Sequence, residues 1–432
     1  MTKKAFKEAM LRGLGRCVLA VRQEPEKYRD LVLWACKRNI GYDTQCEGTR
    51  AWYVYTMANC YGDVSPFIEA AAEALKKYRF KGGWDLSHLG ELLMFFAMDG
   101  HIAARKAVEG IYEELLTSML KRKRRPYCAV FHELGNLETI GCLLADSGEA
   151  FLRIAKDFGG LYRRKSYLHD GDFDCFYSVK GREYRKTLER GAKRDEDIVC
   201  FLKREQAYEE EMESQWNRRR EAGAENVTGP LLSLRLRRQK DQEKIREYAQ
   251  AYRDQIQPEE RAEALKAFCW CSYPDDPAPI IADTQSECEA LVNAAWRALE
   301  HIHHPLARSF ALENYESGIR TEENFAILAT NFTRWDGELM EALLQEQIET
   351  KDWDNVHGMC MNVIRSYDDF KGIPRPKHLL PILYQYNPCS CCRESVLQIM
   401  SKHRMLTKPL LEECLYDSYD HIRTMAAKKR NE

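Results

Sequence analysis

The densest group of reactive side chains in the sequence is the run Cys389-Ser390-Cys391-Cys392. Thiolates are soft ligands of zinc, and a tetrahedral zinc site needs four thiolate or imidazole ligands. Cys414 or His403 would have to complete such a site. If the run begins a helix, only two of its three thiols can face the same way. We therefore predict reduced cysteines without a metal or other cofactor. The alternative is a zinc site drawn from Cys389, Cys391, Cys392 and Cys414.

A second group of polar and aromatic residues lies between Gly41 and Tyr53 and contains Asp43, Glu47, Arg50 and Trp52. Carboxylates and a guanidinium beside an indole ring suit the recognition of a polar partner. These four residues are the partner-binding residues that the sequence predicts. The alternative interpretation is an elaborate helix cap with Trp52 in the core. A third hypothesis is an enzyme of unrecognised class with its site near Asp43, Glu47 and Arg50.

Two basic stretches have the composition of a phosphate-binding surface. The first contains Lys121, Arg122, Lys123, Arg124 and Arg125, and the second contains Arg235, Arg237 and Arg238. The alternative for the first stretch is a charged helix end, stopped by Pro126 and favoured by the helix dipole. The 65 basic and 67 acidic residues give a formal net charge of −2. This balance provides no general attraction to nucleic acid, so such binding would depend on local patches.

Familiar catalytic motifs are missing from the sequence. There is no Gly-x-x-x-x-Gly-Lys loop for phosphates and no Gly-x-Ser-x-Gly elbow for a nucleophilic serine. The sequence therefore favours a non-enzymatic protein.

The elements that position these residues are expected to be helices. Hydrophobic residues form 44% of the chain and charged residues 31%, with 14 prolines and 24 glycines among 432 residues. Few chain breakers and apolar residues at helical spacing, such as Leu31, Trp34 and Ala35, predict helices joined by short turns. One helix is expected over 89–97, capped by Asp85 or Ser87. A loop is expected at 166–182, and long charged helices are expected on either side of a loop at 221–230.

The sequence predicts a cytoplasmic protein without a membrane span. No stretch approaches the roughly 18 apolar residues that a transmembrane helix requires. The 16 cysteines are scattered through apolar stretches, where a thiol in a reducing compartment behaves as a small buried hydrophobe.

Internal similarity is the strongest signal in the sequence. A Pro or Asp that begins a helix, then Arg, then a small or aliphatic residue recurs in 305–312, 388–397 and 420–426. We call the position of the Arg in this pattern the marker position. With two less similar segments included, it falls at residues 261, 308, 357, 393 and 423, with separations of 47, 49, 36 and 30 residues. Such spacing brackets that of two-helix repeats.

The segment 416–426 resembles the HEAT-repeat consensus, in which one helix ends in Asp and the next opens with an acidic residue, an aliphatic residue and Arg. The resemblance implies an all-α, HEAT-like (armadillo-type) helical-repeat solenoid. An Arg of the first turn would reach the Asp of a neighbouring repeat. We predict helical, degenerate repeats over 1–165, a polar, loop-containing central insert over 166–254 and HEAT-like repeats over 255–432.

The function that this resemblance favours is a non-enzymatic scaffold, which binds a protein or peptide along the solenoid surface. The alternative is a HEAT-like nucleic-acid-binding protein, related in fold to DNA glycosylases. A mixed or acidic groove would favour a protein partner, and a continuous positive groove would favour nucleic acid.

Overall fold

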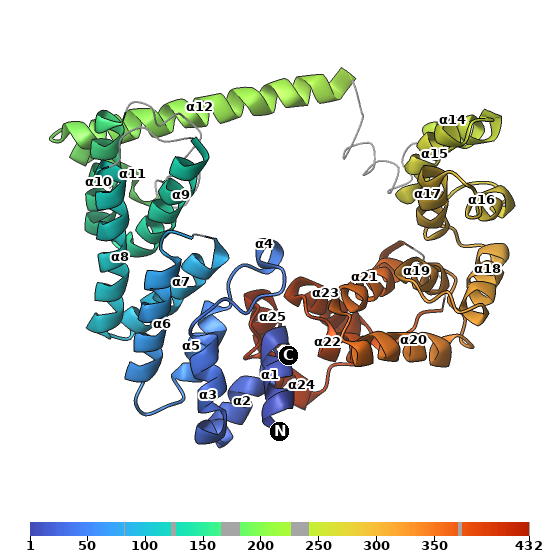
Figure 1. Cartoon of the computed structure of the whole chain (residues 1–432), viewed down its shortest axis with the longest axis horizontal. Coiled ribbons are helices and arrows are strands. Elements are labelled where there is room, and N and C mark those ends of the chain that lie inside the picture. Colours follow the sequence, from blue (N-terminus) through green and yellow to red (C-terminus); the bar gives the residue numbers. More distant parts are fainter. Residues whose placement is uncertain (82, 122–126, 166–181, 226–241, 370–373, 432) are drawn as a thin grey trace. The chain divides into compact units, whose positions relative to one another are not determined.

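The computed structural model describes residues 1–81, 83–121, 127–165, 182–225, 242–369 and 374–431. In these ranges every regular element is a helix and no strand is present (Figure 1). The all-α prediction is therefore confirmed. The loop predicted at 166–182 lies outside the described residues except for its last residue. The chain forms two compact units: unit 1 contains Met1–Arg220 and Lys408–Glu432, and unit 2 contains Glu221–Thr407.

Unit 1 is built from helices at both ends of the chain. The last residues of α12 belong to unit 2. The helices are α1 (Lys3–Arg12), α2 (Arg16–Gln23), α3 (Pro25–Ala35), α4 (Thr44–Glu47), α5 (Ala51–Ala58), α6 (Ser65–Tyr78), α7 (Trp84–Met98), α8 (Ile102–Lys121), α9 (Tyr127–Leu144), α10 (Gly148–Arg164), α11 (Arg182–Ala192), α12 (Glu196–Glu225), α24 (Lys408–Cys414) and α25 (Asp420–Asn431).

Residues 408–432 join unit 1 through close contacts with the first two helices. The Ser418 N–H donates to the Gly13 carbonyl at 2.9 Å, and Arg16 Nε donates to Glu413 Oε1 at 2.9 Å. A Cβ added at Gly15 would lie 1.9 Å from the Glu413 carbonyl oxygen. A glycine is therefore needed where the two ends of the chain meet.

In unit 2, too, every regular element of the described residues is a helix. Its helices are α14 (Gln242–Asp254), α15 (Pro258–Leu265), the 3₁₀ helix η2 (Lys266–Cys269), α16 (Ala278–Asp283), α17 (Glu289–Leu299), α18 (Pro305–Glu316), α19 (Glu322–Thr330), α20 (Gly337–Thr350), α21 (Trp353–Asp369), α22 (Leu379–Tyr386) and α23 (Ser390–Lys402).

Helices of unit 2 pack in a regular order. The odd-numbered helices α15, α17, α19, α21 and α23 pack in succession, each against the next. Each even-numbered helix from α16 to α22 also packs against the odd-numbered helix that follows it. The apolar faces of these short helices are thus buried by neighbours on more than one side, as one amphipathic helix alone could not achieve.

Two ion pairs of unit 2 join the start of one helix to a later helix. Arg261 in α15 lies 2.6 Å from Asp283 at the end of α16. Arg308, in the first turn of α18, donates from Nε to Asp336 at 3.2 Å, immediately before α20. Both arginines occupy marker positions of the sequence repeat, and each contacts an aspartate.

Candidate functional site

A groove of about 530 Å³ lies in unit 2 and is lined mainly by the odd-numbered helices. Residues of η2, α17, α19, α21 and α23, or directly after them, form its walls. Because these helices pack in succession, side chains from far apart in the sequence meet there. The charged groups of the lining are four carboxylates and two guanidinium groups: Glu300, Glu322, Glu323 and Asp368, with Arg297 and Arg365.

One ion pair crosses between two of the helices that line the groove. Arg365 of α21 donates from Nη1 to Glu300 Oε2 at 3.0 Å and lies 3.3 Å from His301 Nε2. The two charged side chains are 17% and 16% exposed. Burial raises the pKa of Glu300, and the charge of Arg365 opposes that rise. The pair therefore holds a charge on this carboxylate away from bulk water.

Three other carboxylates of the groove are outside this ion pair. Glu322, Glu323 and Asp368 form no hydrogen bond or ion pair with the residues that the structure describes. Burial and the nearby charges of Glu323 and Glu300 raise the pKa of Glu322, whereas His357 and Arg365 lower it. Outside the Arg365–Glu300 pair, these three carboxylates outnumber the one remaining guanidinium, Arg297, so the groove has an excess of negative charge that an added positive charge would offset.

Two large apolar side chains stand beside these acids. Trp270, directly after η2, is 50% exposed, and Met361 of α21 is 51% exposed. Both line the groove. An exposed indole ring and a flexible thioether offer apolar contact area to a bound side chain, and the indole face also attracts cations.

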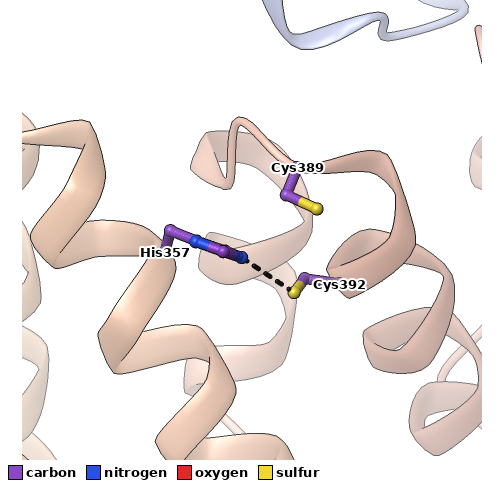
Figure 2. A group of neighbouring side chains, drawn as sticks. All are labelled: His357, Cys389 and Cys392. Carbon is purple, nitrogen blue, oxygen red and sulfur yellow. Dashed lines mark hydrogen bonds between the residues drawn. The ribbon is translucent and has the colours of Figure 1, made fainter. Parts of the chain in front are cut away.

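A thiol–imidazole cluster lies beside the groove. Figure 2 shows His357 reaching from α21 toward Cys389 and Cys392 at the start of α23. The ligand atoms of the three residues lie within 4.8 Å of one another, and His357 Nε2 is 3.2 Å from Cys392 Sγ. Cys389 is buried, whereas Cys392 is half-buried and also lines the groove.

The structure brings together some of the cysteines named from the sequence. Cys389 and Cys392 share the cluster, because residues three apart lie on the same side of a helix. Among the described residues Cys391 is outside this group, and Cys414 belongs to unit 1. His357 was not among the ligands predicted from the sequence. The sequence pattern that could have pointed to it is the pair of matching spacings, His357-x-x-Cys360 and Cys389-x-x-Cys392.

Asp43, Glu47 and Arg50 lie together in unit 1 and hold loops in place. Asp43 caps α4 by accepting from the Gln45 and Cys46 backbone N–H groups. The Glu47 carboxylate accepts from the N–H groups of Tyr42 at 2.7 Å and of Asp43 at 2.8 Å. The elaborate-cap interpretation therefore describes the contacts of Asp43 and Glu47.

Arg50 forms a buried ion pair with Glu47, at 2.8 Å between Nη2 and Oε2, and each side chain is 1% exposed. Arg50 Nη1 also donates to the carbonyl oxygens of Leu11 and Ile40. These internal contacts tie α1 and the segment before α4 to α5, and they leave neither charged group accessible to a partner.

Trp52 is half-buried in α5 and lies under a guanidinium from the other end of the chain. The Arg423 Cζ is 3.7 Å from the centroid of the indole ring. Arg423 also donates to the carbonyl oxygens of Asp417 at 2.8 Å and Ser418 at 2.9 Å. Trp52 thus helps to hold α25 against α5 within unit 1.

Most residues of the two basic stretches cannot be placed. Lys121 is exposed at the end of α8. Arg122, Lys123, Arg124 and Arg125, and likewise Arg235, Arg237 and Arg238, lie outside the described residues.

Comparisons of the chain with protein-family models, with curated proteins and with solved structures each found no match. In the part of the chain that the structure describes, no helix has both the length and the apolar character needed to cross a bilayer.

Proposed function

We propose that unit 2 is a HEAT-like repeat scaffold whose groove binds a basic segment of a protein partner. The successive packing of α15, α17, α19, α21 and α23 supports the repeat part of this proposal. The Arg261–Asp283 and Arg308–Asp336 ion pairs support it further, since they occur at repeat positions. Stacked helix pairs characteristically present an extended surface to partners.

The residues that line the groove indicate which kind of partner it would bind. Three carboxylates outside the Arg365–Glu300 pair, with only Arg297 as a further cation of the lining, lie beside the half-exposed Trp270 and Met361. Lysine or arginine side chains would neutralise the carboxylates, and an aliphatic or aromatic residue would cover the apolar pair. The buried Glu47 and Arg50 serve the fold of unit 1, so we place the partner site in the groove of unit 2 and not at residues 43–52.

Nucleic acid is the alternative partner. An acidic groove repels phosphates, and binding to a duplex would have to use basic residues outside the groove. The groove itself therefore favours a protein. A cytoplasmic, reducing location belongs to the same proposal, because the cysteines that the structure describes form no disulfide.

Selection from a random-peptide library on the purified full-length chain tests this proposal. We expect enriched peptides to combine Lys or Arg residues with an aromatic or aliphatic residue, and their binding to weaken as salt rises. A short DNA duplex should bind more weakly than these peptides at the same ionic strength. Enrichment of acidic peptides, or tighter binding of the duplex, would overturn the proposed function.

A further inference from the structure

The side chains of His357, Cys389 and Cys392 have the composition of a zinc site. Thiolate and imidazole are the ligands that zinc prefers in proteins. Tetrahedral zinc bonds to sulfur and nitrogen place neighbouring ligand atoms roughly 3.5–3.8 Å apart. The three ligand atoms already lie within 4.8 Å of one another, with 3.2 Å between His357 Nε2 and Cys392 Sγ. Small side-chain rotations would therefore complete the geometry.

The backbone holds these ligands on two packed helices. Cys389 is the N-cap residue of α23, and Cys392 lies in its first turn. The facing helix α21 packs against α23 and supplies His357. Two ligands three residues apart on one helix and a third from its neighbour form a preorganised set, because no loop has to fold around the ion.

Without a metal, the Cys392 side chain of this cluster favours its protonated thiol form. The hydrogen bond with Cys389, followed by burial, raises the pKa of the Cys392 thiol. A divalent cation would reverse this preference, since it stabilises thiolates directly.

From this geometry we propose that His357, Cys389 and Cys392 bind one zinc ion at the edge of the groove, with the fourth coordination position open toward the groove. Cys392 lines the groove, so a bound molecule or water can approach from that side. Three protein ligands and one open position are typical of zinc sites that take an exogenous ligand. This proposal does not depend on which partner the groove binds.

Cys360 and Cys391 lie close in sequence to the proposed ligands but are not assigned to the zinc site. Cys360 lies one turn along α21 from His357, and burial raises its pKa to about 12, opposed by a hydrogen bond with Asn387. Cys391 lies next to Cys392 on α23. Neither sulfur belongs to the group of mutually close ligand atoms among the described residues. These two cysteines therefore provide matched controls.

The test is metal analysis of the full-length chain, purified without a histidine tag, together with titration of the metal-free chain by Co²⁺. We expect about one equivalent of zinc per chain. Co²⁺ should give tetrahedral ligand-field bands and thiolate-to-metal charge-transfer absorption. Cys389→Ser, Cys392→Ser and His357→Gln should each lower metal affinity by about tenfold or more, whereas Cys391→Ser and Cys360→Ser should retain the metal.

Circular dichroism of each variant separates loss of the metal from loss of the fold. Fewer than about 0.2 equivalents of zinc together with no Co²⁺ absorption would overturn the site. Loss of the metal in a folded Cys360→Ser chain would overturn the open fourth position. Loss in Cys391→Ser but not in Cys392→Ser would overturn the ligand assignment. A Cys389–Cys392 disulfide in the freshly purified chain, detected by thiol counting, would likewise contradict it.

Discussion

The guanidinium of Arg365 lies 3.0 Å from the carboxylate of Glu300, 65 residues earlier in the chain. This ion pair joins α21 to the residue directly after α17, and both side chains line the groove. It leaves Glu322, Glu323 and Asp368 as the acids available to a partner. The pair thus contributes to the fold, whereas the other carboxylates are available for binding.

Replacement of Arg365 by Met should destabilise the chain by about 2–3 kcal/mol, because Glu300 would remain in a largely buried place without its cation. Urea denaturation followed by circular dichroism measures this loss. Arg320→Met is the matched control in the same unit, since the Arg320–Glu346 pair is 45% and 41% exposed. The control should cost far less, because solvent screens an exposed ion pair. Equal losses in the two variants would contradict the assigned role of Arg365.

Replacement of Arg50 by Met should destabilise unit 1 by about 3–5 kcal/mol, since Glu47 would be left buried and unpaired. The exposed Lys3–Asp30 pair supplies the comparison, with side chains 53% and 60% exposed. Asp30→Asn should cost less than about 1 kcal/mol. Thermal unfolding of the three proteins checks the difference. If Arg50→Met unfolds at the temperature of Asp30→Asn, the buried ion pair does not stabilise unit 1 as described.

His88 predicts a pH dependence of stability. Its side chain is fully buried in α7, and burial, followed by the charge of Arg50, lowers its pKa from 6.5 to about 3. The folded state therefore keeps His88 neutral where the unfolded state binds a proton. The stabilisation is fully present above the unfolded pKa of 6.5 and is lost as the pH falls toward 3.

The measurement is the free energy of unfolding of the wild-type chain and of His88→Leu between about pH 6 and about pH 4. The wild type should lose about 1.4 kcal/mol more per pH unit than the variant, which has no titrating group at this position. Parallel pH profiles would show that His88 is protonated, or accessible, in the folded chain.

The contact between Gly15 and Glu413 leads to a prediction about how tightly residues 408–431 pack on the first helices. An added methyl group would collide with the Glu413 carbonyl oxygen, so Gly15→Ala should cost at least about 1–3 kcal/mol and loosen residues 408–432. At Gly62 a Cβ would have no neighbour within 4 Å. Gly62→Ala is therefore the control and should leave stability nearly unchanged. Hydrogen exchange of α24 and α25 reports the loosening directly. Unchanged exchange in Gly15→Ala would argue against this contact.

Local sequence patterns predicted the helical class, because periodicity and capping act over a few residues. Pro305 begins α18 as the pattern indicates, and Arg308 reaches Asp336. The helix expected over 89–97 instead begins at Trp84. Its expected cap, Asp85, accepts a hydrogen bond from the Asn39 N–H at 2.7 Å, a partner 46 residues earlier that no local pattern identifies.

The candidate sites were harder to predict, because their residues meet through contacts between segments far apart in the sequence. Cys389 and Cys392 stood out because they lie in one short run of the sequence, whereas His357 reaches them through the packing of α21 on α23. The mixture of residues around Glu47 and Arg50 suggested recognition. A buried ion pair and an exposed partner-binding site contain the same residue types, and only the burial of the side chains distinguishes the two.

The most direct test of the proposed groove is the affinity of a selected basic peptide for a triple variant. This variant combines Glu322→Gln, Glu323→Gln and Asp368→Asn. The substituted side chains keep their shape but lose three negative charges. We predict binding weaker by roughly tenfold or more by fluorescence anisotropy. A control that changes three exposed acids outside the groove lining, Glu260→Gln, Glu338→Gln and Glu341→Gln, should bind as the wild type does. Equal affinity of the two triple variants for the peptide would contradict the groove as the binding site.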